Sequence, residues 1–271
     1  MDNYSVLMSV YYKEKPDHLN ESIRSIYEQT VQTNDFVLVC DGPLTEELNA
    51  VISGWGKSFG GKMHVFRLKE NHGLGFALNA GIKRCKNELV ARMDSDDIAV
   101  SDRCYRQLKV FEEHPETDVV SGTVSEFNMV PGDLNTKRIV PESDADILAF
   151  AKKRNPFNHP CVMYKKSRVT EAGGYKQFYL LEDYYLWVRM LLKGAKGHNI
   201  QEPLLYMRVG NGMYKRRSGI KHARSQIRLF RYMHSKGFIS SAELIKASCI
   251  RTAASLIPNG LRKAGYRMFL R

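Results

Sequence analysis

The fold is decided by the stretch Glu88-Leu89-Val90-Ala91-Arg92-Met93-Asp94-Ser95-Asp96-Asp97. Its largely apolar first half predicts a buried strand, and the strand ends at three carboxylates in four residues. Such a cluster is costly inside a protein unless a positive charge lies with it. At the carboxyl end of a parallel strand, where open α/β sheets bind ligands, a divalent cation is the natural partner, and an all-oxygen ligand set favours Mg²⁺ or Mn²⁺ over zinc. Asp94, Asp96 and Asp97 are therefore candidate metal ligands.

The same residues have a second interpretation, which is a solvated acidic turn in front of a helix. Ser101 and Asp102 are typical of a helix start, and such a turn needs no ligand. Because a short motif is a hypothesis that requires its context, the stretch alone does not decide between a metal site and a turn.

The chain before this stretch supplies part of the context. Short apolar runs predict three strands: 6–10, 36–40 and 63–68. Helical spacing predicts a helix from Pro16 and another over 46–52, then a glycine-rich loop over 54–62 and a glycine loop leading into a helix after Asn71. This order predicts a Rossmann-like, mainly parallel α/β sheet flanked by helices, with its strand ends along one edge.

The chain after this stretch predicts a second half of the same body. It contains a polar, loop-like region over 125–145, a proline-bounded turn over 155–160 and a last strand over 203–209. A helix begins at Glu182-Asp183, although acids in a first turn are often only caps and dipole partners. Neither a GxGxxG motif nor a P-loop lysine occurs at the expected positions, which argues against a nicotinamide-dependent or P-loop enzyme.

Length and composition agree with one α/β domain and an appendage, or with two small domains, since the chain has 271 residues and is 43% hydrophobic. We divide it into a body over 1–215 and a basic helical extension over 216–271. No apolar run approaches the ~20 residues that span a bilayer, and Met1–Ser5 does not resemble a signal peptide. Five widely spaced cysteines without a CxxC pair are typical of reduced core residues in a cytosolic protein.

The positive charge of the chain is confined to its end. The formal net charge is +12, yet residues 215–271 hold 14 Lys and Arg against the single acid Glu243. The other 214 residues hold 27 Lys and Arg against 28 Asp and Glu. A basic tail of this kind attracts anionic membrane surfaces or nucleic acid.

Taken together, the motifs over residues 4–210 resemble glycosyltransferase family 2, whose fold is called GT-A. The similar motifs, in chain order, are Ser9-Val10-Tyr11-Tyr12, Asp41-Gly42, Asn71 to Gly81, Asp94 to Asp97, Asn155 to Pro160, Gly173-Gly174-Tyr175 and Glu182-Asp183. Arg208-Val209 followed by 213–217 is similar to the bacterial transferases of O-antigen, capsule and exopolysaccharide assembly.

The resemblance implies a nucleotide-sugar site at the strand ends. Tyr11 and Asp41 would hold the base, usually uracil, by stacking and by accepting its N3–H. The chain has one acid here, directly after Cys40, where many members have two. Asn71 and the loop at Gly73 would bring backbone close to the nucleotide.

The acidic turn matches the DxD motif of the family. The resemblance implies that one of Asp94, Asp96 and Asp97 contacts the ribose while one or two of the others bind Mn²⁺ or Mg²⁺, which would bridge the diphosphate. Arg208 and the cluster 215–217 would contact phosphates from a loop that closes over the donor, although such a cluster is also typical of a solvated surface loop.

Asp183 matches the catalytic base of the family. It would take the proton from an acceptor hydroxyl as that oxygen attacks the anomeric carbon from the face opposite the leaving group, so that configuration is inverted. Glu182 and His159 are acceptor candidates, although a lone histidine between Asn-Pro turns is more often structural.

The function implied is transfer of a hexose or N-acetylhexosamine from a UDP-sugar to an undecaprenyl-diphosphate-linked saccharide in bacterial surface polysaccharide synthesis. The basic tail would hold the enzyme on the inner face of the plasma membrane, as a cytoplasmic peripheral protein. Two alternatives are a nucleic-acid-binding protein that uses the tail, which the near-neutral body disfavours, and a nucleotidyltransferase on a similar fold.

Overall fold

A computed structural model of the chain describes residues 3–210 and 220–256, and its side chains up to residue 251. The strands are β1 (Tyr4–Val10), β2 (Asp35–Cys40), β3 (Met63–Arg67), β4 (Leu89–Asp94), β5 (Ile98–Ala99), β6 (Val119–Phe127), β7 (Thr136–Arg138), β8 (Met163–Lys165) and β9 (Gly197–Arg208). The helices are α1 (Pro16–Tyr27), α2 (Glu46–Ser58), α3 (Leu74–Ile82), α4 (Arg103–Glu113), α5 (Asp144–Ala151), α6 (Lys166–Glu171), α7 (Glu182–Leu191), α9 (Ile220–Ser235) and α10 (Ser241–Leu256), with the 3-10 turn η1 (His159–Cys161). The basic cluster 215–217 lies outside the described residues.

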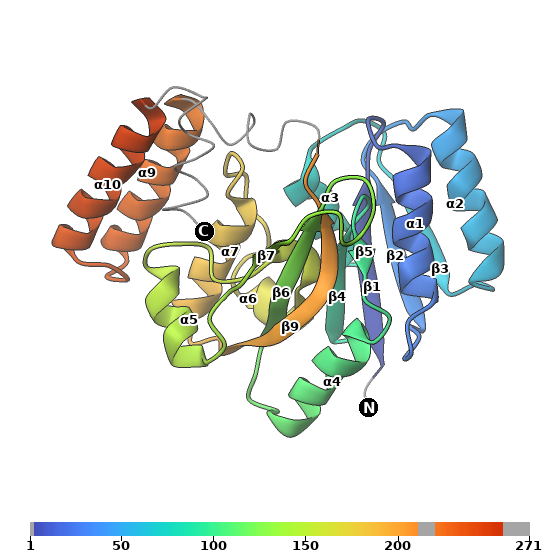
Figure 1. Ribbon diagram of the computed structural model, residues 1–271, viewed down its shortest axis with the longest axis horizontal. Helices are drawn as coiled ribbons and strands as arrows, with labels where there is room; N and C mark the ends of the chain where they lie inside the picture. The colour runs from blue at the N-terminus through green and yellow to red at the C-terminus, as the bar shows by residue number, and fades with distance from the viewer. Residues whose placement is uncertain (1–2, 211–219, 257–271) are drawn as a thin grey trace.

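The strands form one mixed sheet in the order β3-β2-β1-β4-β8-β6-β9-β5, with β7 paired to β6 (Figure 1). β3, β2, β1 and β4 are parallel, and β8 is antiparallel to both β4 and β6. Because β9 is parallel to β6, both run in the direction of β1–β4. The carboxyl ends of six strands therefore share one edge of the sheet, as the predicted Rossmann-like order requires.

The central strands are mostly apolar on both sides because both faces of the sheet are covered. In β1, Val6 and Met8 join a core shared with α1, α2 and α4, while Leu7 points into a core shared with α3 and α7. The mainly parallel α/β sheet predicted from the sequence is confirmed.

Three regions differ clearly from the prediction, whereas the predicted bounds of β1, β2 and β3 lie within two residues of the observed ones. The predicted loop over 54–62 is helical up to Ser58, because Trp55 packs against the core. The predicted loop over 125–145 contains the end of β6 and all of β7, and buried Phe127 explains the longer β6. The last strand begins at Gly197 rather than 203, since it pairs with β6 across a register shift.

The C-terminal helices pack against the body. In α9, Leu229, Phe230 and Met233 are buried in the same core as α7, whereas Ile220, at the start of the helix, is 64% exposed. Four cysteines are buried as predicted, but Cys249 on α10 is exposed because that side of the helix faces solvent. The division at residue 215 stays a prediction. Among the described helices, none combines the length and apolarity needed to cross a bilayer.

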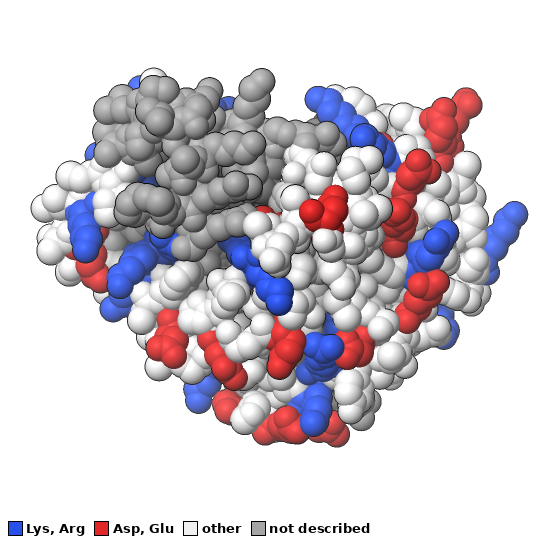
Figure 2. Space-filling model, in the orientation of Figure 1, with Lys and Arg blue, Asp and Glu red and all other residues white. Residues whose placement is uncertain are grey.

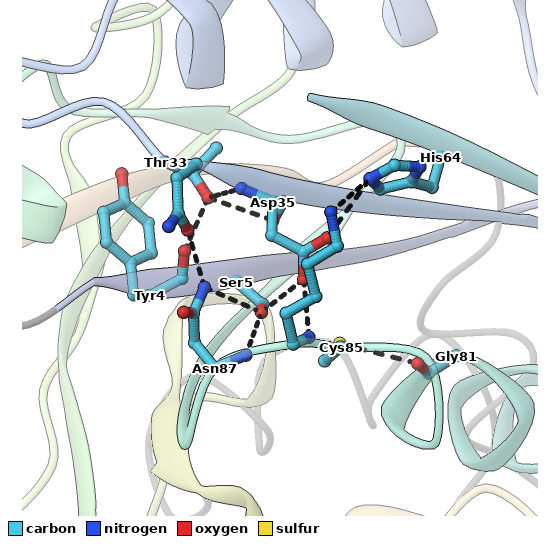
Figure 3. Close-up of polar contacts among 10 residues, drawn as sticks. Tyr4, Ser5, Thr33, Asp35, His64, Gly81, Cys85 and Asn87 are labelled. Carbon is cyan, nitrogen blue, oxygen red and sulfur yellow. Dashed lines mark hydrogen bonds and ion pairs between the residues drawn. The ribbon is translucent and has the colours of Figure 1, made fainter. Parts of the chain in front are cut away.

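The amino edge of the sheet is closed by a buried polar network (Figure 3). Asp35 is fully buried and accepts hydrogen bonds from Ser5 Oγ at 2.6 Å and from the backbone of Lys86 at 2.8 Å. Asn87 in turn donates from its backbone to Ser5 Oγ at 3.1 Å. This network fixes the starts of β1 and β2 against the turn before β4, whereas the opposite edge carries the acidic residues.

Candidate active site

The acidic turn after β4 forms a compact carboxylate cluster. Oxygen atoms of Asp94, Asp96 and Asp97 lie within 4.8 Å of one another. Burial, and then the charges of Asp94 and Glu14, raise the pKa of Asp96 to about 7. Burial and the two neighbouring carboxylates raise the pKa of Asp97 well above its usual value. A cation bound here would relieve this repulsion, and the all-oxygen donors suit Mg²⁺ or Mn²⁺, so the residues present fit a divalent metal.

Residues that the sequence did not single out hold this turn in place. Arg92, which is almost completely buried within β4, forms an ion pair with Asp94. Glu14, in the loop after β1, accepts a hydrogen bond from Ser95 Oγ at 2.6 Å. The sequence could have pointed to Arg92, because it is a charged residue inside an otherwise apolar strand. Nothing in the sequence around Glu14 pointed to a role at the acidic turn.

Arg208 braces the turn from the end of β9. Its backbone N–H donates to Asp97 Oδ1 at 2.8 Å, and its Nε donates to the carbonyl of Asp96 at 2.9 Å. The guanidinium also pairs with Glu21 at 2.6 Å and lies 4.4 Å from the ring centroid of Phe127. Arg208 is therefore beside the predicted donor site but engaged with protein groups, and its contact with a phosphate stays a prediction.

Asp41, which follows β2 at the carboxyl edge of the sheet, is hydrogen-bonded to the loop that precedes α3. Its carboxylate accepts hydrogen bonds from the backbone N–H groups of His72 at 2.8 Å and Gly73 at 2.9 Å, and the Asn71 side chain donates to its carbonyl at 3.0 Å. Gly42 follows with φ +90°, and a Cβ there would lie 2.8 Å from the Asn71 nitrogen, so only glycine fits. Asp41 thus shapes the loop that precedes α3.

Tyr11 and Tyr12 cover the loop after β1. Their rings meet edge to face with centroids 5.8 Å apart, and they are 36% and 51% exposed. An exposed ring at the strand ends is available for stacking. The roles of Tyr11, Asp41, Asn71 and Gly73 toward a nucleotide base stay predictions.

Asp183 lies in the first turn of α7. Asn155 donates its side-chain amide to Asp183 Oδ2 at 2.6 Å, which orients the carboxylate. Burial, and to a lesser degree the Asp183 charge, raises the pKa of Glu182. The preceding Leu180 adopts φ 58°, the one non-glycine residue with positive φ among those described. A strained residue two positions before Glu182 is typical of a functional turn.

Tyr175 is buried beside the acidic turn and its neighbours. Burial raises its pKa, the nearby Arg92 lowers it, and the charges of Asp183 and Asp94 contribute smaller increases. Its hydroxyl is 2.8 Å from Nε2 of His159. Burial and the nearby Arg92 lower the pKa of His159 well below its usual value, so His159 is neutral and pairs with Tyr175. The acceptor role of His159 stays a prediction.

The start of α3 packs against this region. Asn79 Nδ2 donates to the carbonyl of Tyr175 at 2.6 Å, and the Tyr175 N–H donates to Asn79 Oδ1 at 2.7 Å. A Cβ at Gly75 would lie 3.7 Å from Glu182 Cγ. Asp41 holds Gly73, directly before the start of α3, so Asp41 and Glu182 both lie near the same end of this helix.

Comparison with known proteins agrees with this arrangement. The family model described as "Glycosyl transferase family 2" matches residues 5–171. A galactosyltransferase of Escherichia coli, named UDP-Gal:alpha-D-GlcNAc-diphosphoundecaprenol beta-1,3-galactosyltransferase, is 38% identical over 99% of this chain and 96% of its own. The amylovoran biosynthesis glycosyltransferase AmsE of Erwinia amylovora is 38% identical over 94% of each chain, and an uncharacterized glycosyltransferase of Haemophilus influenzae is 40% identical over 99% of each.

Solved structures show the same fold at low identity. Staphylococcus aureus TarS, residues 1–349, superposes with TM-score 0.69 at 16% identity over 100% of this chain and 76% of its own. A mannosyltransferase of Pyrobaculum calidifontis, determined with GDP-Man and Mn²⁺, superposes with TM-score 0.66 at 16% identity over 99% and 81%.

A mixed sheet of this order, with a carboxylate cluster at its carboxyl edge, defines the class of GT-A sugar transferases. The family model covers more than half of the chain, and the E. coli and Erwinia relatives are alike along nearly their full lengths. The chain belongs to glycosyltransferase family 2, and it is a glycosyltransferase. Membership of this family favours sugar transfer over the nucleic-acid-binding and nucleotidyltransferase alternatives.

Proposed function

We propose that the protein is an inverting, metal-dependent transferase of bacterial surface polysaccharide synthesis. It moves a hexose or N-acetylhexosamine from a UDP-sugar to a hydroxyl of an undecaprenyl-diphosphate-linked saccharide. The observation that carries this proposal is the compact carboxylate cluster of Asp94, Asp96 and Asp97 at the carboxyl edge of the sheet. The named E. coli relative, whose donor and acceptor are of these two classes, supports the same assignment.

On the donor side, Asp94, Asp96 and Asp97 would hold the divalent cation together with the diphosphate. When bound, the cation supplies positive charge to the departing nucleotide. The rings and backbone groups near Tyr11, and the loop held by Asp41, would enclose the base. Arg92 and Arg208 keep the acidic turn in one conformation, so little reorganisation is needed when the donor enters.

On the acceptor side, Asp183 would act as general base. Its Oδ2 is held by Asn155, and the carboxylate takes the proton of the acceptor hydroxyl as the new bond from that oxygen to the anomeric carbon forms. The bond from the anomeric carbon to the diphosphate breaks on the opposite face, and UDP leaves. Attack from behind turns an α-linked donor into a β-glycoside. Glu182, beside this base, would orient the acceptor.

The location we propose is the inner face of the plasma membrane. The lipid-linked acceptor lies in that leaflet, and the excess of basic residues in 215–271 suits its anionic surface. In the face shown in Figure 2, the described acidic and basic side chains of the body are interspersed, so no continuous basic stripe for a nucleic acid is visible there.

A thermal-shift panel tests the proposed donor and metal together. We expect one UDP-sugar to raise the melting temperature more than UDP alone, and only when Mn²⁺ or Mg²⁺ is present. A GDP-sugar and a UDP-sugar of different configuration serve as matched controls. Stabilisation by all nucleotides alike, or by UDP-sugars equally well in a chelator, would contradict the metal-dependent assignment. Release of UDP upon addition of the lipid-linked acceptor then identifies transfer.

A further inference from the structure

The loop between β6 and β7 exposes two neighbouring apolar side chains. Met129 is 75% exposed, the highest value among the large apolar side chains of the described residues, and Val130 is 62% exposed. We call residues 128–133 the β6 tip. Single exposed apolar residues are ordinary on protein surfaces, but two adjacent ones at the end of a projecting loop form a patch that water solvates poorly.

The β6 tip is held in one conformation by its own acid. The carboxylate of Asp133 accepts hydrogen bonds from three backbone N–H groups: Asn128 at 2.9 Å, Met129 at 2.7 Å and Val130 at 3.3 Å. These bonds, rather than burial, lower the pKa of Asp133. The Asp133 N–H also donates to the Val130 carbonyl at 3.1 Å, which closes the turn. The closed turn leaves the Met129 and Val130 side chains exposed to solvent.

The β6 tip lies at the edge of the sheet that carries the candidate active site. β6 and β9 run side by side toward this edge (Figure 1). The Val209 N–H donates to the carbonyl of Phe127 at 2.8 Å, directly before the tip, and the Arg208 guanidinium covers the Phe127 ring. Arg208 is also the residue whose backbone holds Asp97. The tip is therefore linked to the acidic turn through Phe127, which contacts Arg208, and through Arg208, which contacts Asp97.

A strongly basic segment of the chain follows β9 in the sequence. A Cβ at Gly210 would lie 3.5 Å from Asn128 Oδ1, so the chain passes beside the tip as it leaves β9. The residues that follow include Lys215-Arg216-Arg217, at the start of the region that holds 14 basic residues and one acid. Exposed apolar side chains, in a chain that also has a strongly basic segment, are the combination that binds the interface of an anionic bilayer.

We propose that the β6 tip is a membrane contact, in which Met129 and Val130 enter the interfacial layer of an anionic bilayer beside the active site. The choice of a bilayer rests on the proposed function, because the acceptor of that reaction is embedded in lipid. This contact turns the carboxyl edge of the sheet toward the leaflet and keeps Asp183 within reach of a saccharide whose diphosphate lies at the lipid surface.

Sedimentation of the full-length protein with vesicles tests the contact directly. The vesicles contain phosphatidylglycerol and phosphatidylethanolamine, with phosphatidylcholine vesicles as the neutral reference. The double variant Met129→Asp, Val130→Asp should lower the vesicle partition coefficient about tenfold, because two charges replace the inserted side chains. Ile139→Asp is the matched control: Ile139 is 66% exposed but follows β7, which runs back from the tip, and it should bind as the parent does. Equal binding of the double variant and the parent would overturn the proposal.

Transfer rates to a membrane-embedded and a water-soluble acceptor distinguish a role of the tip in membrane contact from a role in the reaction itself. With the saccharide on an undecaprenyl diphosphate embedded in vesicles, the double variant should transfer several-fold more slowly than the parent. With the same saccharide on a short, water-soluble diphosphate carrier, both should be equal. A loss on both acceptors would make the tip part of the active site and overturn the membrane assignment. If the parent transfers to neither acceptor, the proposed function fails, while vesicle binding still decides the role of the tip.

Discussion

The buried guanidinium of Arg92 forms an ion pair with Asp94, the first carboxylate of the acidic turn. Its Nε and Nη1 have no hydrogen-bond partner among the described residues, so burying this cation is costly. Asp94 is 34% exposed and regains water when its partner is removed. We therefore expect Arg92→Met to change the free energy of unfolding by no more than about 1 kcal/mol, while the transfer rate falls more than about tenfold because the turn loses its internal cation.

Arg103 provides the matched control for this prediction. It is equally buried, but its guanidinium donates to backbone carbonyls, including that of Arg92 at 2.7 Å and that of Pro160 at 3.4 Å. Arg103→Met leaves these carbonyls unpaired, so it should lower the melting temperature clearly. Equal losses of melting temperature in the Arg92 and Arg103 variants would mean that Arg92 is a structural residue.

Asp183→Asn should preserve donor binding and lower the transfer rate by about 10²–10⁴-fold, the range usual for a general base. The reason is that an amide at this position still reaches Asn155 but takes no proton from the acceptor. The rate is measured as UDP released per saccharide formed, and donor affinity as the thermal shift with UDP-sugar. Glu182→Gln, one residue away, should have the smaller effect on rate. Unchanged turnover of the Asp183 variant would remove it as the base.

The response to metal should depend on pH. The pKa of Asp96 is raised to about 7, so between about pH 4 and pH 7 the folded protein binds more protons than the unfolded chain. Within that window, this residue makes the free energy of unfolding of the metal-free protein fall as the pH rises. Because Mn²⁺ competes with the same protons, it should raise the melting temperature more at about pH 8 than at about pH 5.5. Asp96→Asn should remove most of this difference, and equal shifts at both pH values would argue against Mn²⁺ binding at Asp96.

The exposed cations of α9 should contribute to membrane binding. Arg224 and Arg231 are exposed and lie seven residues apart, on one face of the helix. Reversing both charges, as Arg224→Glu with Arg231→Glu, should weaken binding to anionic vesicles about tenfold or more, since each basic residue near such a surface contributes about 1 kcal/mol. The double variant Lys57→Glu, Lys62→Glu changes net charge equally on the body and is the control. If both double variants lost vesicle affinity equally, net charge alone would explain the effect. At high salt, the difference in vesicle affinity between the two variants should vanish.

Several strands, helix starts and acidic residues could be predicted from the sequence because each depends on a short stretch of neighbouring residues. The run from Leu89 predicted β4, and the acids that follow it predicted a carboxylate cluster at the strand end. Pro16 and Glu182-Asp183 marked helix starts that the structure has at the same residues. Boundaries were wrong where packing overrides local preference, as at Trp55, which extends α2 across glycines.

The sequence by itself determined the order of strands and helices, the sugar-transferase family and the acids at the strand ends, since each depends on residues close together in the chain. Only the tertiary structure decided which distant groups surround those acids. Parallel pairing of β1 with β4 places Ser9 beside Asp94, and so brings the loop with Glu14 to the acidic turn. The packing of α3 and α7 brings Asn79 to Tyr175. Such pairs arise from sheet register and helix packing, which connect positions about 80 to 100 residues apart and leave no pattern in the neighbouring sequence.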